Sequence, residues 1–130
     1  MMVCFGGRDA NGNTLNDTWG LRKHRDGRWD WVKAPIKKSD SSLLPKGRYQ
    51  HRGTFIGSLL AIIGGRSDRI DDNLPLQVYD TETSEWHNFD SIQTFRHTCW
   101  STKQSIFLYG GFMKDVPNVP VSTITEINLE

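Results

Sequence analysis

The sequence predicts an all-β fold built from short antiparallel strands. The 130 residues include 12 Gly and 14 aromatic residues, five of them Trp, and no segment keeps the 3.6-residue apolar period of a helix. Instead, short apolar runs rich in Val, Ile, Phe and Tyr are separated by clusters of Gly, Asn, Asp and Ser, which is typical of strands joined by tight turns. An apolar run that ends in Gly-Gly occurs three times, at 3–7, 59–65 and 105–111. We therefore expect a repeated β unit.

Each unit is predicted to hold four strands, of which the run ending in Gly-Gly is the second. The first strand starts near RYQH in one unit and near FRH in the next. His51 precedes Gly64 by the same 13 residues as His97 precedes Gly110, so two hairpins match at an offset of 46. A third strand carries Trp19 or Tyr79, and a fourth carries Trp29 or Trp86. The single region 1–130 then divides into 2–33 (second to fourth strands), 48–90 (a full unit) and 95–129 (first three strands).

These features resemble kelch repeats, which form the blades of a β-propeller. The fold class expected from this resemblance is all-β: a partial kelch β-propeller of about three incomplete four-stranded antiparallel blades. Glycine tolerates positive φ and close backbone approach, and the aromatic residues fill the space between blades. The residues that define the repeat are Gly6, Gly7, Gly64, Gly65, Gly110, Gly111, Trp19, Tyr79, Trp29 and Trp86.

Three blades do not close a ring, because a propeller takes about 4 to 8 of them. The chain is therefore expected to be part of a longer protein and to expose apolar faces and strand edges. Pairing between copies of the chain would cover these faces, so self-association is a further expectation.

The segment 5–35, followed by RYQH, resembles the kelch region of kelch-containing Ser/Thr protein phosphatases of plants, algae and apicomplexan parasites, which in plants act in brassinosteroid signalling. The resemblance implies that the propeller precedes a phosphatase domain that holds two metal ions. This chain would be the C-terminal part of that propeller, an interaction module that positions protein substrates or regulators. The alternatives are that the activity is that of the parent metal-dependent phosphatase, a hydrolase, or that the chain is a kelch adaptor unrelated to phosphatases.

No catalytic, metal-binding or cofactor-binding residue is expected in this region. The motifs GDxHG, GDxxDRG and GNHE, which would hold two metal ions, are absent from the sequence, and the four His are scattered. Alternation along a strand places His97 and Cys99 on one face, where a packed thiol is favoured over a reactive pair. No helix follows the GGRDANG loop to bind phosphate, and DANGN is typical of an Asn-Gly turn and not of a calcium loop.

The charges divide unequally along the chain. Residues 1–65 carry 11 basic and 5 acidic groups, and residues 66–130 carry 5 and 10. The loops that follow the three Gly-Gly pairs (8–17, 66–74 and 112–122) should share one rim of the propeller, where binding residues concentrate. This rim is expected to bind a protein or phosphoprotein through arginines. Its candidate residues are Arg8, Asp9, Arg66, Asp68, Arg69, Lys114 and Asp115.

A second candidate group lies at the start of the innermost strands: Arg48, His51, Arg96 and His97. These side chains either line the central channel or satisfy buried carbonyl groups. Ser39, Ser41 and Ser42, which lie beside lysines, are candidate phosphorylation sites. Nucleic acid is an unlikely partner, because Trp29 and Trp31 alternate with polar residues as in a strand. No apolar run is long enough to cross a membrane, so the expected location is intracellular, in the cytoplasm, the nucleus or both.

Overall fold

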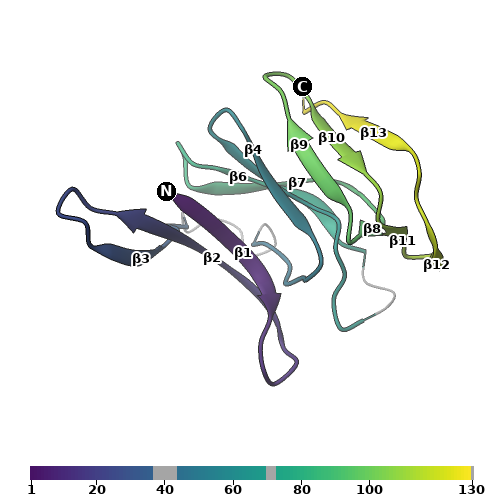
Figure 1. The fold of residues 1–130 in the computed structure, drawn as a ribbon, viewed down its shortest axis with the longest axis horizontal. Coiled ribbons are helices and arrows are strands. Elements are labelled where there is room, and N and C mark those ends of the chain that lie inside the picture. The colour runs from purple at the N-terminus through teal and green to yellow at the C-terminus, as the bar shows by residue number, and fades with distance from the viewer. Residues whose placement is uncertain (37–43, 70–72, 130) are drawn as a thin grey trace.

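The computed structural model describes residues 1–36, 44–69 and 73–129, and these residues form strands and no helix (Figure 1). Ser39, Ser41 and Ser42 lie outside the described residues. The strands are β1 (Met2–Arg8), β2 (Thr14–Lys23), β3 (Trp29–Lys33), β4 (Arg52–Ile56), β5 (Leu59–Ile63), β6 (Pro75–Asp80), β7 (Glu85–Ser91), β8 (Thr94–Phe95), β9 (Thr98–Ser101), β10 (Ile106–Tyr109), β11 (Phe112–Met113), β12 (Val116–Pro120) and β13 (Ile124–Ile127).

The strands form three consecutive antiparallel sheets that lie side by side as propeller blades (Figure 1). The first blade has the order β1-β2-β3, the second β4-β5-β6-β7, and the third β9-β10-β13. The predicted fold class, all-β with antiparallel sheets of three or four strands, is confirmed. The third blade carries a small additional sheet, β8-β11-β12.

This additional sheet differs from the loop that the sequence analysis expected at 112–122. β11 and β12 form a hairpin whose two-residue turn is Lys114 and Asp115, and β11 also pairs with β8, with Phe112 opposite Phe95. The backbone groups after Gly111 therefore find hydrogen-bond partners on both sides, which an extended solvent-exposed loop would lack.

The hydrophobic core lies between neighbouring blades, and the two-residue period of the strands supplies both interfaces of the second blade. One set of its side chains faces the first blade and the alternate set faces the third. The first interface contains Phe5, Leu60, Ile62, Tyr79 and Trp86, and the second contains Ala61, Ile63, Leu76, Val78, Ile106 and Leu108. Strands β5 and β6 are thus covered on both faces, which explains their continuous apolar sequence.

The double glycines allow the blades to approach closely, as predicted. Gly64 has φ +67°, and a Cβ atom there would lie 2.3 Å from the carbonyl oxygen of Thr94 on the next blade. Within the third blade, Gly111 has φ +72°, and its Cβ would lie 2.4 Å from the carbonyl oxygen of Phe95. No side chain fits either position without moving backbone.

The two tryptophans of the fourth strands have different surroundings, and for Trp29 the predicted packing between blades stays a prediction. Trp86 is 3% exposed and packs against Tyr79 and Phe5, with ring centroids 5.1 and 5.5 Å apart. Trp29 is 59% exposed. It lies on the face of β3 opposite to Ala34, the side chain that packs toward the second blade, so no described blade covers it.

Candidate functional site

Two of the predicted rim arginines belong to one row of alternating cationic and aromatic side chains. The guanidinium of Arg8 lies 5.2 Å from the ring centroid of Tyr49, and that of Arg66 lies 5.4 Å from Tyr49 and 4.8 Å from Phe95. Phe95 in turn contacts Phe112, with centroids 5.8 Å apart. We call these five residues, Arg8, Tyr49, Arg66, Phe95 and Phe112, the arginine–aromatic row.

The double-glycine repeat builds this row across all three blades. Arg8, Arg66 and Phe112 each follow a Gly-Gly pair, and Tyr49 and Phe95 occupy matching positions at the offset of 46. Tyr49 and Arg66 exchange backbone hydrogen bonds, both 2.9 Å long, which fix the arginine beside the aromatic ring. The row therefore rests on backbone pairing within each blade and crosses from one blade to the next.

Arg66 is held by its rings and keeps hydrogen-bonding capacity. Its Nε is buried and, among the described residues, has no hydrogen-bond acceptor. Contact with aromatic faces restrains a guanidinium without using its N–H donors, which suits it to a carboxylate or phosphate. The chemistry that the row offers is therefore that of a hydrogen-bond donor to an oxyanion.

The acidic rim candidates are engaged with neighbouring groups. Asp68 Oδ1 lies 3.9 Å from Arg8 Nη2, and both side chains are about half exposed, so this ion pair is weak. Asp9 instead organises its own turn, where its Oδ1 accepts hydrogen bonds from the backbone N–H groups of Asn11 and Asn13. These bonds, above all that from Asn13, hold the pKa of Asp9 below its usual range.

The remaining rim candidates are spread over two blades. Arg69 belongs to the loop after β5, where its backbone N–H donates to Ser67 Oγ. Lys114 and Asp115 form the β11–β12 turn on the third blade, and the backbone N–H of Lys114 donates to the carbonyl of Gln93. The row, and not the whole predicted set, is the organised part of the rim.

The channel candidates were expected either to line the central channel or to satisfy buried carbonyl groups. Arg48 and His51 contact carbonyl groups. Arg48 is completely buried, with Nη1 3.2 Å from the Gly64 carbonyl and Nη2 2.7 Å from Gln77 Oε1. Burial lowers the pKa of Arg48 to about 10, so the side chain stays protonated at neutral pH. His51 Nε2 lies 2.8 Å from the carbonyl of Phe5 on the preceding blade. Arg48 thus satisfies a backbone carbonyl of its own blade, and His51 one of the preceding blade.

His97 repeats the position of His51 in the next blade. It is 1% exposed, and a Cβ atom added to Gly64 would lie only 2.6 Å from its Cε1. The nearby carbonyl of Ile63 favours the protonated ring slightly, but neither ring nitrogen has a hydrogen bond of ordinary geometry with any described residue. Burial, assisted by Arg52, lowers the pKa of His97 to about 4, so the imidazole is neutral at pH 7.

Arg96 is the exposed member of the channel group. Its backbone adopts φ +56°, as that of Gln50 adopts +58° at the matching position, and its N–H donates to the carbonyl of Gln50. Arg52, which the sequence analysis did not select, is also exposed and lowers the pKa of both His51 and His97. The sequence feature that could have identified Arg52 is its position directly after His51.

Burial raises the pKa of Cys99, as expected of a packed thiol. Among residues 1–36, 44–69 and 73–129, no three His, Cys, Asp or Glu side chains gather closely enough to hold a metal ion. Within the same ranges there is no helix of the length and apolarity needed to cross a membrane.

Two of the four Lys and Arg side chains of the basic segment 22–28 are paired within its own hairpin. Arg22 Nε lies 2.7 Å from Asp30 Oδ1, His24 Nε2 lies 3.1 Å from Asp30 Oδ2, and Arg28 Nε lies 2.7 Å from Asp26 Oδ2. Arg22, followed by His24, lowers the pKa of Asp30 to about 2. The pairing therefore halves the positive charge that this hairpin offers to a polyanion.

Comparison with known proteins agrees with the blade architecture. No family model matches the chain. The chain is 31% identical over 137 residues to the serine/threonine-protein phosphatase BSL2 of Arabidopsis thaliana, an alignment that covers 85% of the chain and 13% of the phosphatase. An F-box/kelch-repeat protein of Arabidopsis thaliana is 29% identical over 124 residues, 85% of the chain and 25% of that protein. The chain is a kelch-repeat region.

The host cell factor of Drosophila melanogaster also matches this kelch region, with 30% identity over 95 residues. That alignment covers 67% of the chain and 6% of the host cell factor. The kelch region thus spans a quarter or less of each of these relatives.

Proposed function

We propose that this kelch region is a protein-interaction module that binds an acidic or phosphorylated segment of its partner along the arginine–aromatic row. The observation that carries the proposal is the position of Arg66 between Tyr49 and Phe95, with its Nε unpartnered. A guanidinium fixed in this way loses little conformational entropy when it binds a carboxylate or phosphate in a bidentate manner.

Arg8 extends this binding surface to the first blade. Its only ion-pair partner among the described residues is Asp68 at 3.9 Å, a distance longer than a direct hydrogen bond. A phosphate group carries up to two negative charges and three acceptor oxygens, so it can displace this weak contact at Arg8.

We further propose that the module belongs to the propeller of a Ser/Thr protein phosphatase and positions protein substrates or regulators for a catalytic domain elsewhere in the same protein. The support is the 31% identity to a serine/threonine-protein phosphatase over most of the chain. Catalysis and its two metal ions would then reside outside these residues. Reading the coding sequence beyond residue 130 tests this: GDxHG and GNHE motifs support it, and their absence favours a kelch adaptor of the F-box/kelch kind.

The rim is tested by capture of a partner. The immobilised chain is exposed to a library of phosphoserine peptides and to the same peptides without phosphate. We expect retention of phosphopeptides, and loss of that retention in the double variant Arg66→Glu, Arg69→Glu.

The matched control, Arg25→Glu with Lys103→Glu, makes the same change in charge at exposed positions outside the row. Equal retention by the two double variants would show that net charge, and not the row, holds the peptide. Undiminished retention by the Arg66→Glu, Arg69→Glu variant would remove the rim from the proposal.

A further inference from the structure

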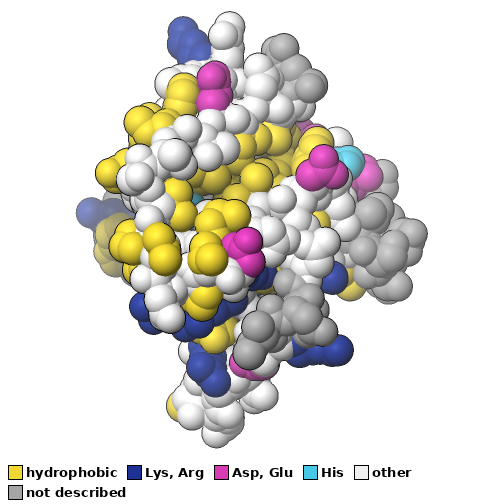
Figure 2. All heavy atoms as spheres, turned by 90° about the vertical axis from the view of Figure 1, so that its right-hand side faces the viewer, with side chains coloured by type: hydrophobic (Ala, Val, Ile, Leu, Met, Phe, Trp, Pro, Cys, Tyr) yellow, Lys and Arg dark blue, Asp and Glu magenta, His cyan; other side chains and the backbone are white. Residues whose placement is uncertain are grey.

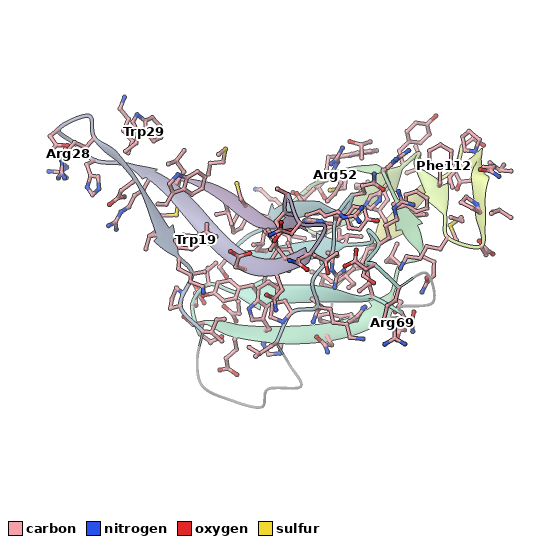
Figure 3. All side chains as sticks on the ribbon, turned by 90° about the horizontal axis from the view of Figure 1, so that it is seen from below. Trp19, Arg28, Trp29, Arg52, Arg69 and Phe112 are labelled. Atoms are coloured by element: carbon pink, nitrogen blue, oxygen red, sulfur yellow. The ribbon has the colours of Figure 1, made fainter. Side chains whose placement is uncertain are left out.

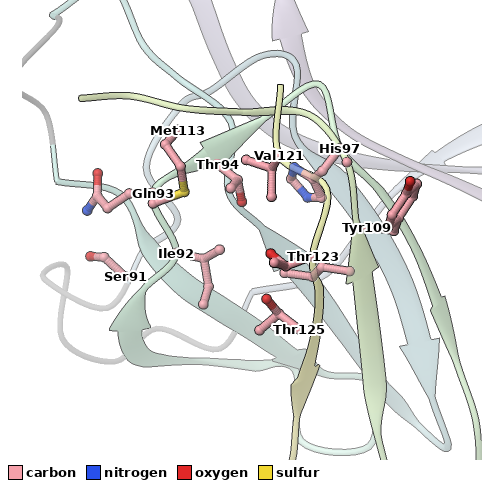
Figure 4. Close-up of a pocket in the computed structure, with 12 residues that line it drawn as sticks. Ser91, Ile92, Gln93, Thr94, His97, Tyr109, Met113, Val121, Thr123 and Thr125 are labelled. Atoms are coloured by element: carbon pink, nitrogen blue, oxygen red, sulfur yellow. The ribbon is translucent and has the colours of Figure 1, made fainter. Parts of the chain in front are cut away.

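A cavity of about 280 Å³, whose mainly apolar lining also carries several polar side chains, lies between the second and third blades (Figure 4). Its wall is formed by the connection that leaves β7, by the start of the third blade and by β13. Thr94 and His97 lie close together on one side, and Thr123 and Thr125 lie on the other (Figure 4). Thr123 and Thr125 are exposed, so the cavity opens to solvent. One water takes about 30 Å³ in the liquid, so there is room for a larger group.

The repeat identifies what fills the same place between the first and second blades. Thr94 corresponds to Arg48: the two are 46 residues apart, and their carbonyl oxygens accept hydrogen bonds from the second glycine of the preceding blade, Gly65 and Gly7. Likewise Thr125 corresponds to Gln77, since Thr125 pairs with Leu108 in the third blade and Gln77 pairs with Ile62 in the second.

In the second blade this place is occupied by a guanidinium. Arg48 is fully buried there and donates to Gln77 Oε1 and to the carbonyl of Gly64, and no carboxylate of the described residues pairs with it. In the third blade two threonines replace the arginine and the glutamine, and the counterpart of Gly64, Gly110, lines the cavity. The cavity is the volume that an arginine side chain occupies in the neighbouring blade.

The wall of the cavity contains polar atoms that the described residues do not satisfy. Thr94 Oγ1 and the two ring nitrogens of His97, one of which is an acceptor in the neutral ring, are buried and have no hydrogen bond of ordinary geometry with those residues; the carbonyl of Ile63 lies near the ring. Buried groups of this kind are costly to leave unpaired, so a bound polar group that uses them is favoured. Arg52 lies near enough to influence His97, but it also influences His51, beside which Arg48 is accommodated. One exposed cation therefore does not exclude a guanidinium.

We propose that the cavity bounded by Thr94, His97 and Thr125 binds an arginine side chain presented by a partner polypeptide, in the place that Arg48 fills between the preceding blades. The guanidinium donates to the Thr94 and Thr125 hydroxyl groups and to the acceptor nitrogen of neutral His97. This site is separate from the arginine–aromatic row, which binds the opposite charge.

The test is an NMR titration of the full chain, labelled so that the Thr94 and Thr125 methyl groups are observed, with the blocked tripeptide Gly-Arg-Gly. Matched tripeptides carry citrulline, which is neutral and nearly isosteric, or norleucine, which is apolar. We expect saturable shifts at both threonines and a citrulline affinity lower by about tenfold, because a hydrogen bond from a charged donor is the stronger one. Free arginine should bind more weakly than the tripeptide.

Variants locate the binding. Thr94→Arg should fill the cavity and abolish tripeptide binding, and Thr125→Val, which keeps the volume and removes an acceptor, should weaken it about tenfold. The second variant decides the matter if the first does not fold. Thr83→Val, at an exposed turn outside the cavity, and Arg66→Glu, in the row, should leave binding unchanged.

Several results would overturn the site. One is the absence of a saturable shift at roughly 50 mM tripeptide, a concentration well above the millimolar Kd expected of one anchoring side chain. Another is that the norleucine tripeptide binds as tightly as the arginine tripeptide. Binding unaffected by Thr125→Val would do the same. Free arginine binding more tightly than the tripeptide would reject a polypeptide as the source. Because Arg66→Glu is expected to have no effect here, failure of this site and failure of the rim are distinguishable.

Discussion

Single residues at the double glycines determine how closely one blade approaches the next. A Cβ atom at Gly6 would lie 2.8 Å from the carbonyl oxygen of Arg48, and one at Gly64 would lie 2.3 Å from that of Thr94. At Gly110, the matching position of the third blade, a Cβ would meet no described atom within 4 Å. The first glycine of each pair is therefore the contact point for the following blade.

Replacing Gly64 with alanine should destabilise the fold far more than the same change at Gly110. Both positions have positive φ, which costs about 1–2 kcal/mol for a residue with a side chain. Gly64→Ala adds a clash with backbone that raises the loss by about 1–3 kcal/mol more. Urea unfolding of the two variants measures the difference, and equal losses would mean that the blades do not touch at Gly64.

The two buried histidines should make stability fall as the pH falls from about 6.5 to about 4. Burial lowers the pKa of His51 and of His97 from 6.5 to about 4. In this range the unfolded chain binds protons that the folded chain does not, so each histidine lowers the free energy of unfolding by about 1.4 kcal/mol per pH unit. Their neutral-state stability is fully present above pH 6.5. Urea unfolding across this range gives the slope.

A single substitution shows how much of this pH dependence comes from His97. His97→Gln should reduce the pH dependence by about half, whatever it does to stability at neutral pH. His87→Gln, at an exposed position, is the matched control and should leave the slope as it is. An unchanged slope in the His97→Gln variant would contradict burial of the neutral ring.

At the scale of strands, the presence or absence of a described blade over a tryptophan decides its contribution. Trp86→Ala in β7 should cost about 3–5 kcal/mol, because the ring is buried against Phe5 and Tyr79 between two blades. Trp29→Ala in β3 should change stability by less than about 0.5 kcal/mol, since its ring is largely exposed. Thermal unfolding of both variants checks this, and similar losses would contradict the assignment of faces.

Several of these strands could be predicted from the sequence because their signals are local. The run LLAIIGG marks β5 and its end, and the 13-residue spacing from His51 to Gly64 and from His97 to Gly110 places the first and second strands of two blades. The position of Arg66 just after β5 followed from the same glycines, whereas Arg8, expected in a loop, is the last residue of β1. Positive φ and alternation are properties of single residues and short segments, so a sequence reveals them directly.

Other features depend on contacts between blades and could not be predicted in this way. Trp29 and Trp86 have similar local sequences, and only the blade packed on one of them distinguishes the two. The spacing does not reveal that Arg66 stacks on Phe95, a residue 29 positions later in the sequence, or that the Arg48 side chain turns into the interface. The β11–β12 hairpin was missed because two prolines, Pro117 and Pro120, disguise a short edge strand.

At the scale of the whole molecule, both outer blades present apolar faces. On the first blade these include Trp29 and Trp31, and on the third blade Trp100, Tyr109 and Ile124. Figure 2 shows hydrophobic side chains gathered around a hollow on the side of the third blade. Figure 3 shows Trp29 and Arg28 at the far end of the first blade, away from Phe112 of the third. A soluble protein rarely leaves faces of this kind uncovered.

We expect the chain, taken alone, to self-associate through these faces. Light scattering at increasing concentration should show a mass of two chains, and a dye that binds exposed apolar surface should bind less as the dimer forms. The double variant Trp29→Ser, Trp31→Ser should shift this equilibrium toward the monomer. A monomer at every concentration, together with weak dye binding, would contradict the expectation.

The arginine–aromatic row is tested most directly by calorimetry with one phosphoserine peptide retained by the chain. Arg66→Lys keeps the charge but loses the planar, stacked guanidinium, whereas Arg25→Lys makes the same change at an exposed position outside the row. We expect the affinity to fall about tenfold for Arg66→Lys, as for loss of one hydrogen bond to a charged group, and to stay the same for Arg25→Lys. Equal affinities of Arg66→Lys and the unaltered chain would contradict binding of the partner by the row.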